Sequence, residues 1–122
     1  MKFQREANSA VTVRHVEKGM IRIGEETLTE NVLLFRDSIV RGWSPKEDDD
    51  LREDDLADLI AKRPEIIIFG SGWRTRLPPR DLVFALARQG IGFETMNTPA
   101  ACRTFNILVS EDRDVAAVLL ID

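Results

Sequence analysis

The sequence predicts a mixed α/β fold in three layers (β/β/α), with helices on one face of a mixed central sheet and an N-terminal antiparallel meander on the other. Residues 66–69 and 115–121 are uninterrupted apolar runs, which indicate strands buried on both faces, because a half-exposed strand would alternate. Amphipathic segments and a further short strand separate these runs at the spacing of βαβ units, so the three later strands should be parallel.

The composition is that of one ordinary globular domain. The chain has 122 residues, 43% of them hydrophobic and 31% charged. We expect a loose segment at residues 1–10 and one domain at 11–122. The net charge of −4 argues against a protein built to neutralise nucleic-acid phosphates. No apolar run approaches the ~20 residues of a membrane span, and residues 1–10 lack a signal-peptide core, so a cytoplasmic location is expected.

Cysteine and histidine are scarce, with one of each. A single cysteine cannot form an internal disulfide, which fits a reducing compartment. These counts also leave too few ligands for the common zinc sites, and we expect neither a metal nor a cofactor.

The first third of the chain predicts the meander. Turn residues at Gly19, 24–26 and 36–38 separate its strands, and Gly19 suits the left-handed position of a tight hairpin. The predicted strands are residues 11–16, 20–23, 27–35 and 39–43.

An acidic stretch follows at residues 44–58 and leads into the first helix. Leu56, Leu59 and Ile60 share a helical face, the acids gather at the helix start, and Pro64 ends the helix. We interpret the stretch as a solvated linker. A calcium loop is the alternative, but its central glycine and terminal glutamate are absent at the required spacing.

Two more helices flank the short strand at residues 91–96. The first spans residues 79–89 and stops before Gly90, and the second begins with Thr98 as N-cap and Pro99 at the first helical position. Their inward residues should be Leu82, Val83, Leu86 and Ala87 in the first, and Ala101, Phe105, Leu108 and Val109 in the second.

The edge where two parallel strands end is the best candidate for a binding site. A glycine-rich loop at residues 70–77 follows one strand, and Thr98 follows the other. The helix starting at Thr98 would offer free N–H groups to an anion, with Arg76 among the nearby charges. The candidate residues for a ligand or partner are Gly70, Ser71, Gly72, Trp73, Arg74, Thr98, Arg103 and Thr104.

This loop matches no standard nucleotide-binding motif. A dinucleotide fingerprint needs a third glycine that enters the helix directly, and a P-loop needs a Gly-Lys-Ser/Thr ending. The glycines can equally serve only to let the chain leave a crowded strand end. Trp43 and Trp73 are expected to anchor layer edges, with Trp73 as an alternative contact for a partner.

No catalytic constellation is evident. Cys102 lies one turn into the last helix, where the dipole can lower a thiol pKa and suit redox sensing, but a small buried hydrophobe is the simpler interpretation. His15 alternates with Val11 and Val13 and is expected at the edge of the core. Glu94 and Asp81 lack the spacing of a carboxylate pair. The sequence therefore gives no positive sign of an enzyme.

Three segments carry a family resemblance: Pro-Glu-Ile-Ile-Ile-Phe-Gly-Ser-Gly at residues 64–72, Glu-Thr-Met-Asn-Thr-Pro-Ala-Ala-Cys-Arg-Thr-Phe-Asn at 94–106, and residues 113–117. From about Val13 to Ile121 the chain resembles the Mth938-like domain proteins, a family of unknown function. The resemblance implies a β/β/α fold and transfers no established catalytic residue. Asn97 stands where the family often has Asp, and Phe105 where it often has Tyr, so any role for a phenol there is lost.

Two functional hypotheses result. The family's eukaryotic relatives include a mitochondrial complex I assembly factor and an adipogenesis-associated protein. The resemblance thus implies a non-enzymatic interaction or assembly factor for a respiratory membrane complex, with respiratory subunits or their insertion machinery as partners. The alternative is a small-molecule or anion-binding protein, with or without catalysis, that uses the loop at 70–76 and the start of the Thr98 helix.

Overall fold

The structure is a computed structural model that describes residues 10–44, 51–74 and 76–121. Within these ranges the chain forms a five-stranded sheet of order β5-β4-β8-β6-β7 and a three-stranded sheet of order β1-β2-β3. The predicted loose N-terminus lies, except for residue 10, outside the described residues, as do residues 45–50 of the acidic stretch. The strands are β1 (Val13–Glu17), β2 (Met20–Ile23), β3 (Glu26–Leu28), β4 (Val32–Phe35), β5 (Ser38–Arg41), β6 (Ile66–Ser71), β7 (Gly92–Met96) and β8 (Val115–Leu120).

The central sheet is mixed, as predicted. Strand β6 pairs in parallel with both β7 and β8, whereas β4 pairs antiparallel with β8 and β5. The apolar runs of β6 and β8 are buried nearly throughout, because both of their faces are covered.

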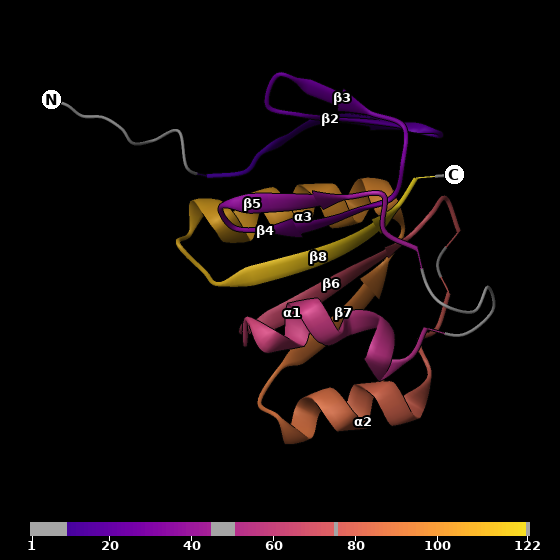
Figure 1. Ribbon diagram of the computed structural model, residues 1–122, viewed down its shortest axis with the longest axis vertical. Helices are drawn as coiled ribbons and strands as arrows, with labels where there is room; N and C mark the ends of the chain where they lie inside the picture. The colour runs from indigo at the N-terminus through magenta and orange to yellow at the C-terminus, as the bar shows by residue number, and fades with distance from the viewer. Residues whose placement is uncertain (1–9, 45–50, 75, 122) are drawn as a thin grey trace, which may run out of the picture.

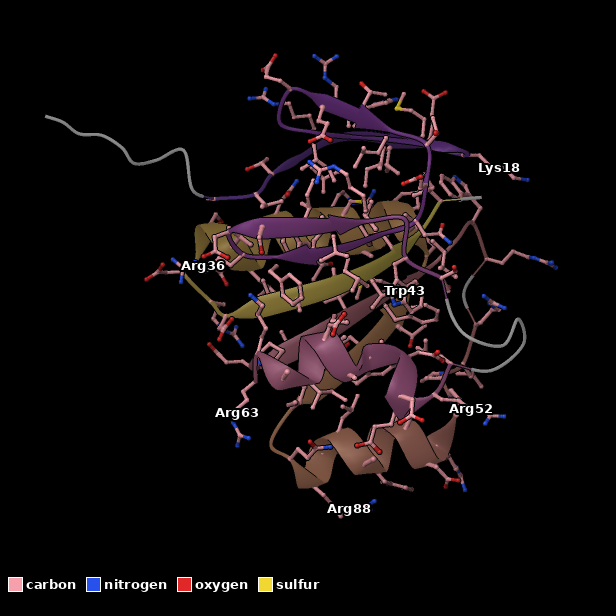
Figure 2. The ribbon with its side chains drawn as sticks, viewed as in Figure 1. Lys18, Arg36, Trp43, Arg52, Arg63 and Arg88 are labelled. Atoms are coloured by element: carbon pink, nitrogen blue, oxygen red, sulfur yellow. The ribbon has the colours of Figure 1, made fainter. Side chains whose placement is uncertain are left out.

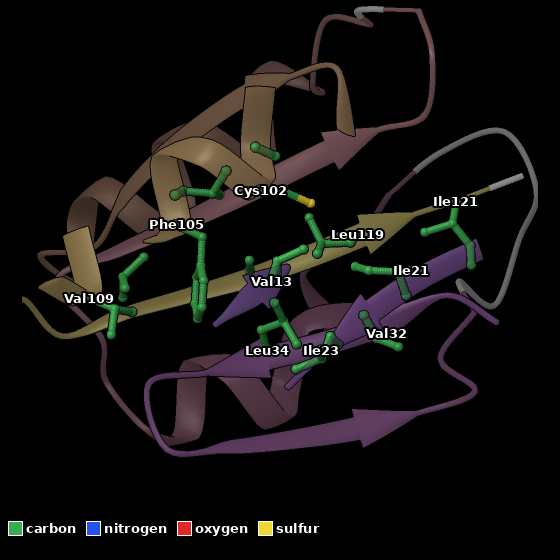
Figure 3. Packing of buried hydrophobic residues seen from close by; sticks show 14 residues of the cluster. Val13, Ile21, Ile23, Val32, Leu34, Cys102, Phe105, Val109, Leu119 and Ile121 are labelled. Carbon is green, nitrogen blue, oxygen red and sulfur yellow. The ribbon is translucent and has the colours of Figure 1, made fainter. Parts of the chain in front are cut away.

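Helices cover both faces of this sheet. The short 3-10 helix η2 (Glu53–Leu56), α1 (Ala57–Ala61) and α2 (Arg80–Arg88) pack on one face, while α3 (Thr98–Ser110) packs on the other, so that α1 lies in front of the sheet and α3 behind it in Figure 1. The three-stranded sheet shares the α3 face, where Ile21 and Ile23 meet Phe105 and Leu119 in one apolar cluster (Figure 3).

The predicted three-layer α/β fold class is confirmed. The structure differs from the prediction in the face of the central sheet on which α3 packs. We expected the helices on the face opposite the meander, but α3 packs beside β1. Right-handed crossovers explain this position, because the chain moves from β6 to β7 in one direction across the sheet and from β7 to β8 in the other, which puts α2 and α3 on opposite faces. Asn106 then ties α3 to β1, since its Oδ1 accepts from the Val13 N–H (2.9 Å) and its Nδ2 donates to the Val13 carbonyl (2.8 Å). The Asn106 amide thus bonds to Val13 as the backbone of a neighbouring strand would.

The meander also differs from the prediction, because residues 27–35 form two strands in different sheets rather than one. Asn31 lies at the corner between β3 and β4. Its main-chain oxygen accepts from Gly42 (3.0 Å) and Trp43 (3.1 Å), and its Oδ1 accepts from the Ile121 N–H (2.9 Å). The β4–β5 hairpin therefore joins the central sheet, and only β1–β3 form the separate layer.

Side chains follow the prediction closely, with two exceptions. Leu82 and Leu86 of α2 are buried, but Ala87 is exposed, because at about 100° per residue it lies on the rim of the nine-residue helix. His15 is exposed rather than at the core edge, since a β-bulge between Val13 and His15 interrupts the alternation.

Trp43 anchors a layer edge, as predicted. It packs against the cluster under α1 and α2, and its Nε1 donates to the Asp55 carbonyl at 3.2 Å (Figure 2).

Candidate functional site

The ends of β6 and β7 meet the start of α3 at one edge of the central sheet. The Thr98 N–H donates to the Gly72 carbonyl (2.7 Å), and the Gly72 N–H donates to Thr98 Oγ1 (2.9 Å). Thr98 Oγ1 in turn donates to the Leu120 carbonyl (2.5 Å) at the end of β8. The glycine loop and Thr98 therefore lie side by side, as the predicted βαβ arrangement requires.

Gly70 lies beneath this edge, where α3 packs closely on β6. A Cβ at this position would lie 2.9 Å from Leu119 Cδ2, 3.0 Å from the Ala101 Cβ and 3.1 Å from Thr98 Oγ1. Only glycine allows this approach without displacement of a neighbour. We conclude that Gly70 packs the helix onto the sheet and does not reach the surface.

The backbone of residues 98–101, the first turn of α3, offers no free N–H to an anion. Asn97, and not Thr98 as predicted, is the N-cap, and its Oδ1 accepts from the Ala100 N–H (2.9 Å). Thr98 donates to Gly72, Pro99 has no N–H, and Ala101 donates to the Asn97 carbonyl. This turn therefore does not provide the anion site that we considered.

Ser71 is also engaged internally. Its side chain is buried, and its hydroxyl lies 2.7 Å from the Arg74 carbonyl and 3.3 Å from the Met96 carbonyl. These contacts fix the turn of the loop, so Ser71 acts as a positioning residue for Trp73 and Arg74.

An open hollow of about 330 Å³ lies next to these internally hydrogen-bonded residues. It is lined by Lys18, Ser71, Gly72, Trp73, Arg74 and Arg76. Trp73 is 37% exposed, and the side chains of Lys18, Arg74 and Arg76 are exposed. The hollow thus combines an accessible indole with three cations.

Lys18 is the member of this site that sequence reasoning missed. It lies in the turn between β1 and β2, more than fifty residues before the glycine loop, and extends from the molecule in Figure 2. The Gly19 N–H donates to the Ile121 carbonyl (2.5 Å), which ties the turn to the end of the sheet. No local sequence pattern predicts this contact between the turn and the end of the sheet.

Arg103 and Thr104 do not line the hollow. Arg103 is exposed on α3, and Thr104 is half-buried, with its Oγ1 3.4 Å from Met96 Sδ. The structure therefore brings Trp73 and Arg74 together at the surface, with the buried Ser71 and Gly72 beneath them in the lining of the hollow. Gly70 and Thr98 are buried.

Cys102 has the environment of an unreactive thiol. It is 4% exposed within the apolar cluster of Figure 3, and burial raises the pKa of its thiol to about 12, against the opposing effect of the Arg103 charge. His15 contacts Glu17 on the exposed side of β1 (2.9 Å) instead of a nucleophile. This geometry argues against redox sensing at Cys102.

Neither a metal site nor a membrane-spanning helix is found in the described ranges. No three His, Cys, Asp or Glu side chains gather there in a way that could hold an ion. None of the helices of residues 10–44, 51–74 and 76–121 is long and apolar enough to cross a bilayer.

Comparison with protein families and curated proteins gives relatives over nearly the whole chain. A family model described as "Protein of unknown function (DUF498/DUF598)" matches residues 13–120. The human protein named NADH dehydrogenase [ubiquinone] 1 alpha subcomplex assembly factor 3 is 34% identical over 121 residues, which cover 97% of this chain and 65% of the human protein. A Francisella tularensis protein named 13 kDa major membrane protein is 30% identical over 103 residues, 83% of this chain and 81% of that protein.

Solved structures share the fold. A Bordetella parapertussis crystal structure superimposes with a TM-score of 0.85 at 30% identity, and the match covers 96% of this chain and 100% of that one. A Bordetella pertussis solution structure described as a Mth938-like domain superimposes with a TM-score of 0.71 at 24% identity and covers 100% of this chain and 93% of that one. The predicted Mth938-like resemblance is therefore confirmed.

Proposed function

The chain belongs to the DUF498/DUF598 family, and from this membership we propose that it is an assembly factor that helps to build a complex I-like respiratory membrane complex. The observation that carries the proposal is the alignment of 97% of this chain with a human protein named as a complex I assembly factor. Because the match spans only 65% of that protein, its partners are transferred to this chain as part of the proposal.

The hollow supplies a suitable contact surface. Interface energy concentrates in a few residues, above all Trp, Tyr and Arg. Trp73, Arg74 and Arg76 present this composition on a loop held by Ser71 and Thr98. We propose that Trp73 contacts respiratory subunits or their insertion machinery without catalysis, in the cytoplasm beside the membrane where the complex is built.

The anion-binding alternative has one observation in its favour, the three cations around the hollow. A small anion is usually held by fixed backbone and hydroxyl donors, and the Gly72 N–H and the Ser71 hydroxyl are already used inside the protein. A thermal-shift screen of phosphates, nucleotides and carboxylates tests this alternative, which requires a saturable rise in the melting temperature.

Affinity purification from the native organism tests the assembly role. The tagged chain, captured after mild cross-linking, should bring down respiratory subunits or membrane insertion machinery, and Trp73→Ala should lose them. Phe84→Ala is the matched control, because Phe84 is exposed on α2 and lies outside the hollow. A preparation free of respiratory proteins would contradict the proposal.

A further inference from the structure

We infer that the hollow binds an acidic segment of a partner protein, in which carboxylates face Lys18, Arg74 and Arg76 and an apolar side chain packs on Trp73. The inference rests on the proposed function and names the chemistry of the partner. The juxtaposition that carries it is three unpaired cations around an exposed indole.

The cations are available to a partner. Among the described residues, the side chains of Lys18, Arg74 and Arg76 form no hydrogen bond or ion pair with any acid. Other arginines are engaged, such as Arg41 with Glu26 and Arg113 with Glu65. The net charge of the chain is −4, so this group of unpaired cations is locally positive on a protein that is negative overall. Such a positive group attracts an acidic partner and helps to orient it on the surface.

The geometry favours an extended segment over a small anion. The groups beneath the hollow with fixed positions, Ser71 Oγ and the Gly72 N–H, already bond within the protein. The free charges lie on long side chains from two separate parts of the chain, with Lys18 in one turn and Arg74 and Arg76 after β6. Such charges can follow successive carboxylates along a peptide, whereas a small anion would have to be held by these long side chains without a fixed donor from the backbone.

Two exposed apolar side chains accompany the cations. Trp73 is 37% exposed, and Leu77, four residues later in the same loop, is 93% exposed. An exposed leucine and indole next to arginines can contact the apolar residue of an amphipathic acidic segment.

Peptide binding to the full chain tests the inference. The probe is a short fluorescent peptide of Asp, Glu and Leu, and its partner probe replaces the acids by Asn and Gln. We expect saturable binding of the acidic peptide only, weakened when salt is raised from about 0.1 M to about 1 M, which shortens the screening length from about 10 Å to about 3 Å. The double variant Arg74→Glu/Arg76→Glu should weaken binding by about tenfold or more.

A matched control reproduces the change in net charge away from the hollow. Arg63→Glu/Arg88→Glu changes the charge by the same amount at exposed positions after α1 and at the end of α2, and Figure 2 shows both arginines far from Lys18. This control should bind the acidic peptide within about twofold of the unaltered chain. Equal binding of both peptides, or an equal loss in both double variants, would overturn the inference.

Two further experiments test a lipid surface as the occupant and the link to the assembly role. In flotation with vesicles of neutral and anionic phospholipids, charge-dependent flotation of the chain without peptide binding would overturn the inference in favour of lipid.

Affinity purification with the double variant tests the link to the assembly role. If Arg74→Glu/Arg76→Glu recovers respiratory proteins as well as the unaltered chain does, the inference is overturned but the assembly role stands. Peptide binding without any respiratory partner would instead contradict the assembly role.

Discussion

Thr98 uses its hydroxyl as both donor and acceptor inside the protein. It is fully buried, accepts from the Gly72 N–H and donates to the Leu120 carbonyl, so one side chain joins the glycine loop, α3 and the end of β8. Its place after a strand was predictable from the sequence. Its role was not, because the partner at Leu120 is set by tertiary packing.

Thr98→Val should therefore destabilise the protein by about 2 to 4 kcal/mol, because an isosteric apolar side chain leaves a buried N–H and a carbonyl unsatisfied. Thr98→Ser, which keeps both bonds and loses a methyl group, should cost only about 1 kcal/mol. Thr104→Val is the matched control, since that hydroxyl only contacts a sulfur at 3.4 Å, and it should cost less than about 1 kcal/mol. Urea unfolding measures all three, and equal losses at positions 98 and 104 would refute this account.

Cys102 should react slowly in the folded protein. With its pKa raised from 9.0 to about 12, the thiolate fraction near neutral pH falls about a thousandfold. Reaction with a chromogenic disulfide reagent at pH 7 should be slow in buffer and fast in denaturant. A native rate like that of a free thiol would restore the redox-sensing hypothesis.

The raised pKa of Cys102 also makes the stability of the protein depend on pH. Above pH 9.0 the thiol ionises in the unfolded chain but stays protonated in the folded one, so the free energy of unfolding should fall as pH rises from about 9 towards 12. Cys102→Ala should remove that part of the fall, as denaturant titrations across this range would measure.

Among the elements, the parallel strands and α3 were the most predictable parts. Continuous apolar runs identify β6 and β8 because both of their faces are buried, and Pro99 marks the start of a helix. The cap residue was misplaced by one position, since Asn97 and Thr98 are both good N-caps and only the geometry shows that Thr98 bonds elsewhere.

The contact between α3 and β6 predicts a strong effect of a single methyl group. Gly70→Ala would place a Cβ within about 3 Å of Leu119, Ala101 and Thr98, and such overpacking should cost about 1 to 3 kcal/mol. Gly92→Ala is the control, because its new Cβ would meet nothing closer than 3.6 Å, and it should change stability by less than about 1 kcal/mol. Thermal or urea unfolding tests the pair, and a neutral Gly70→Ala would mean that α3 shifts freely on the sheet.

For the whole molecule, sequence patterns identified the layers better than their junctions. The break at Asn31, the pairing of Asn106 with Val13 and the approach of Lys18 to the glycine loop all join residues more than fifty positions apart, or redirect the chain between sheets. Periodicity in one segment reports which face is buried and is silent on which distant segment buries it. The candidate site was therefore predicted on its loop side and missed on its hairpin side.

Asn106 is the junction whose loss should separate the layers. Both hydrogen bonds from its amide to Val13 would disappear in Asn106→Ala, which leaves a partly buried N–H and carbonyl on β1 without partners and should cost about 2 kcal/mol. Because Ile21 and Ile23 still bury the small sheet against the core, the fold should persist. Amide hydrogen exchange should then accelerate in β1 and β2 while β6 and β8 stay protected.

Ser110→Ala, at the exposed end of the same helix, is the control and should change stability by no more than about 0.5 kcal/mol. Uniform acceleration across all strands in Asn106→Ala would instead show that the two sheets unfold as one unit and that Asn106 does not hold a separable layer.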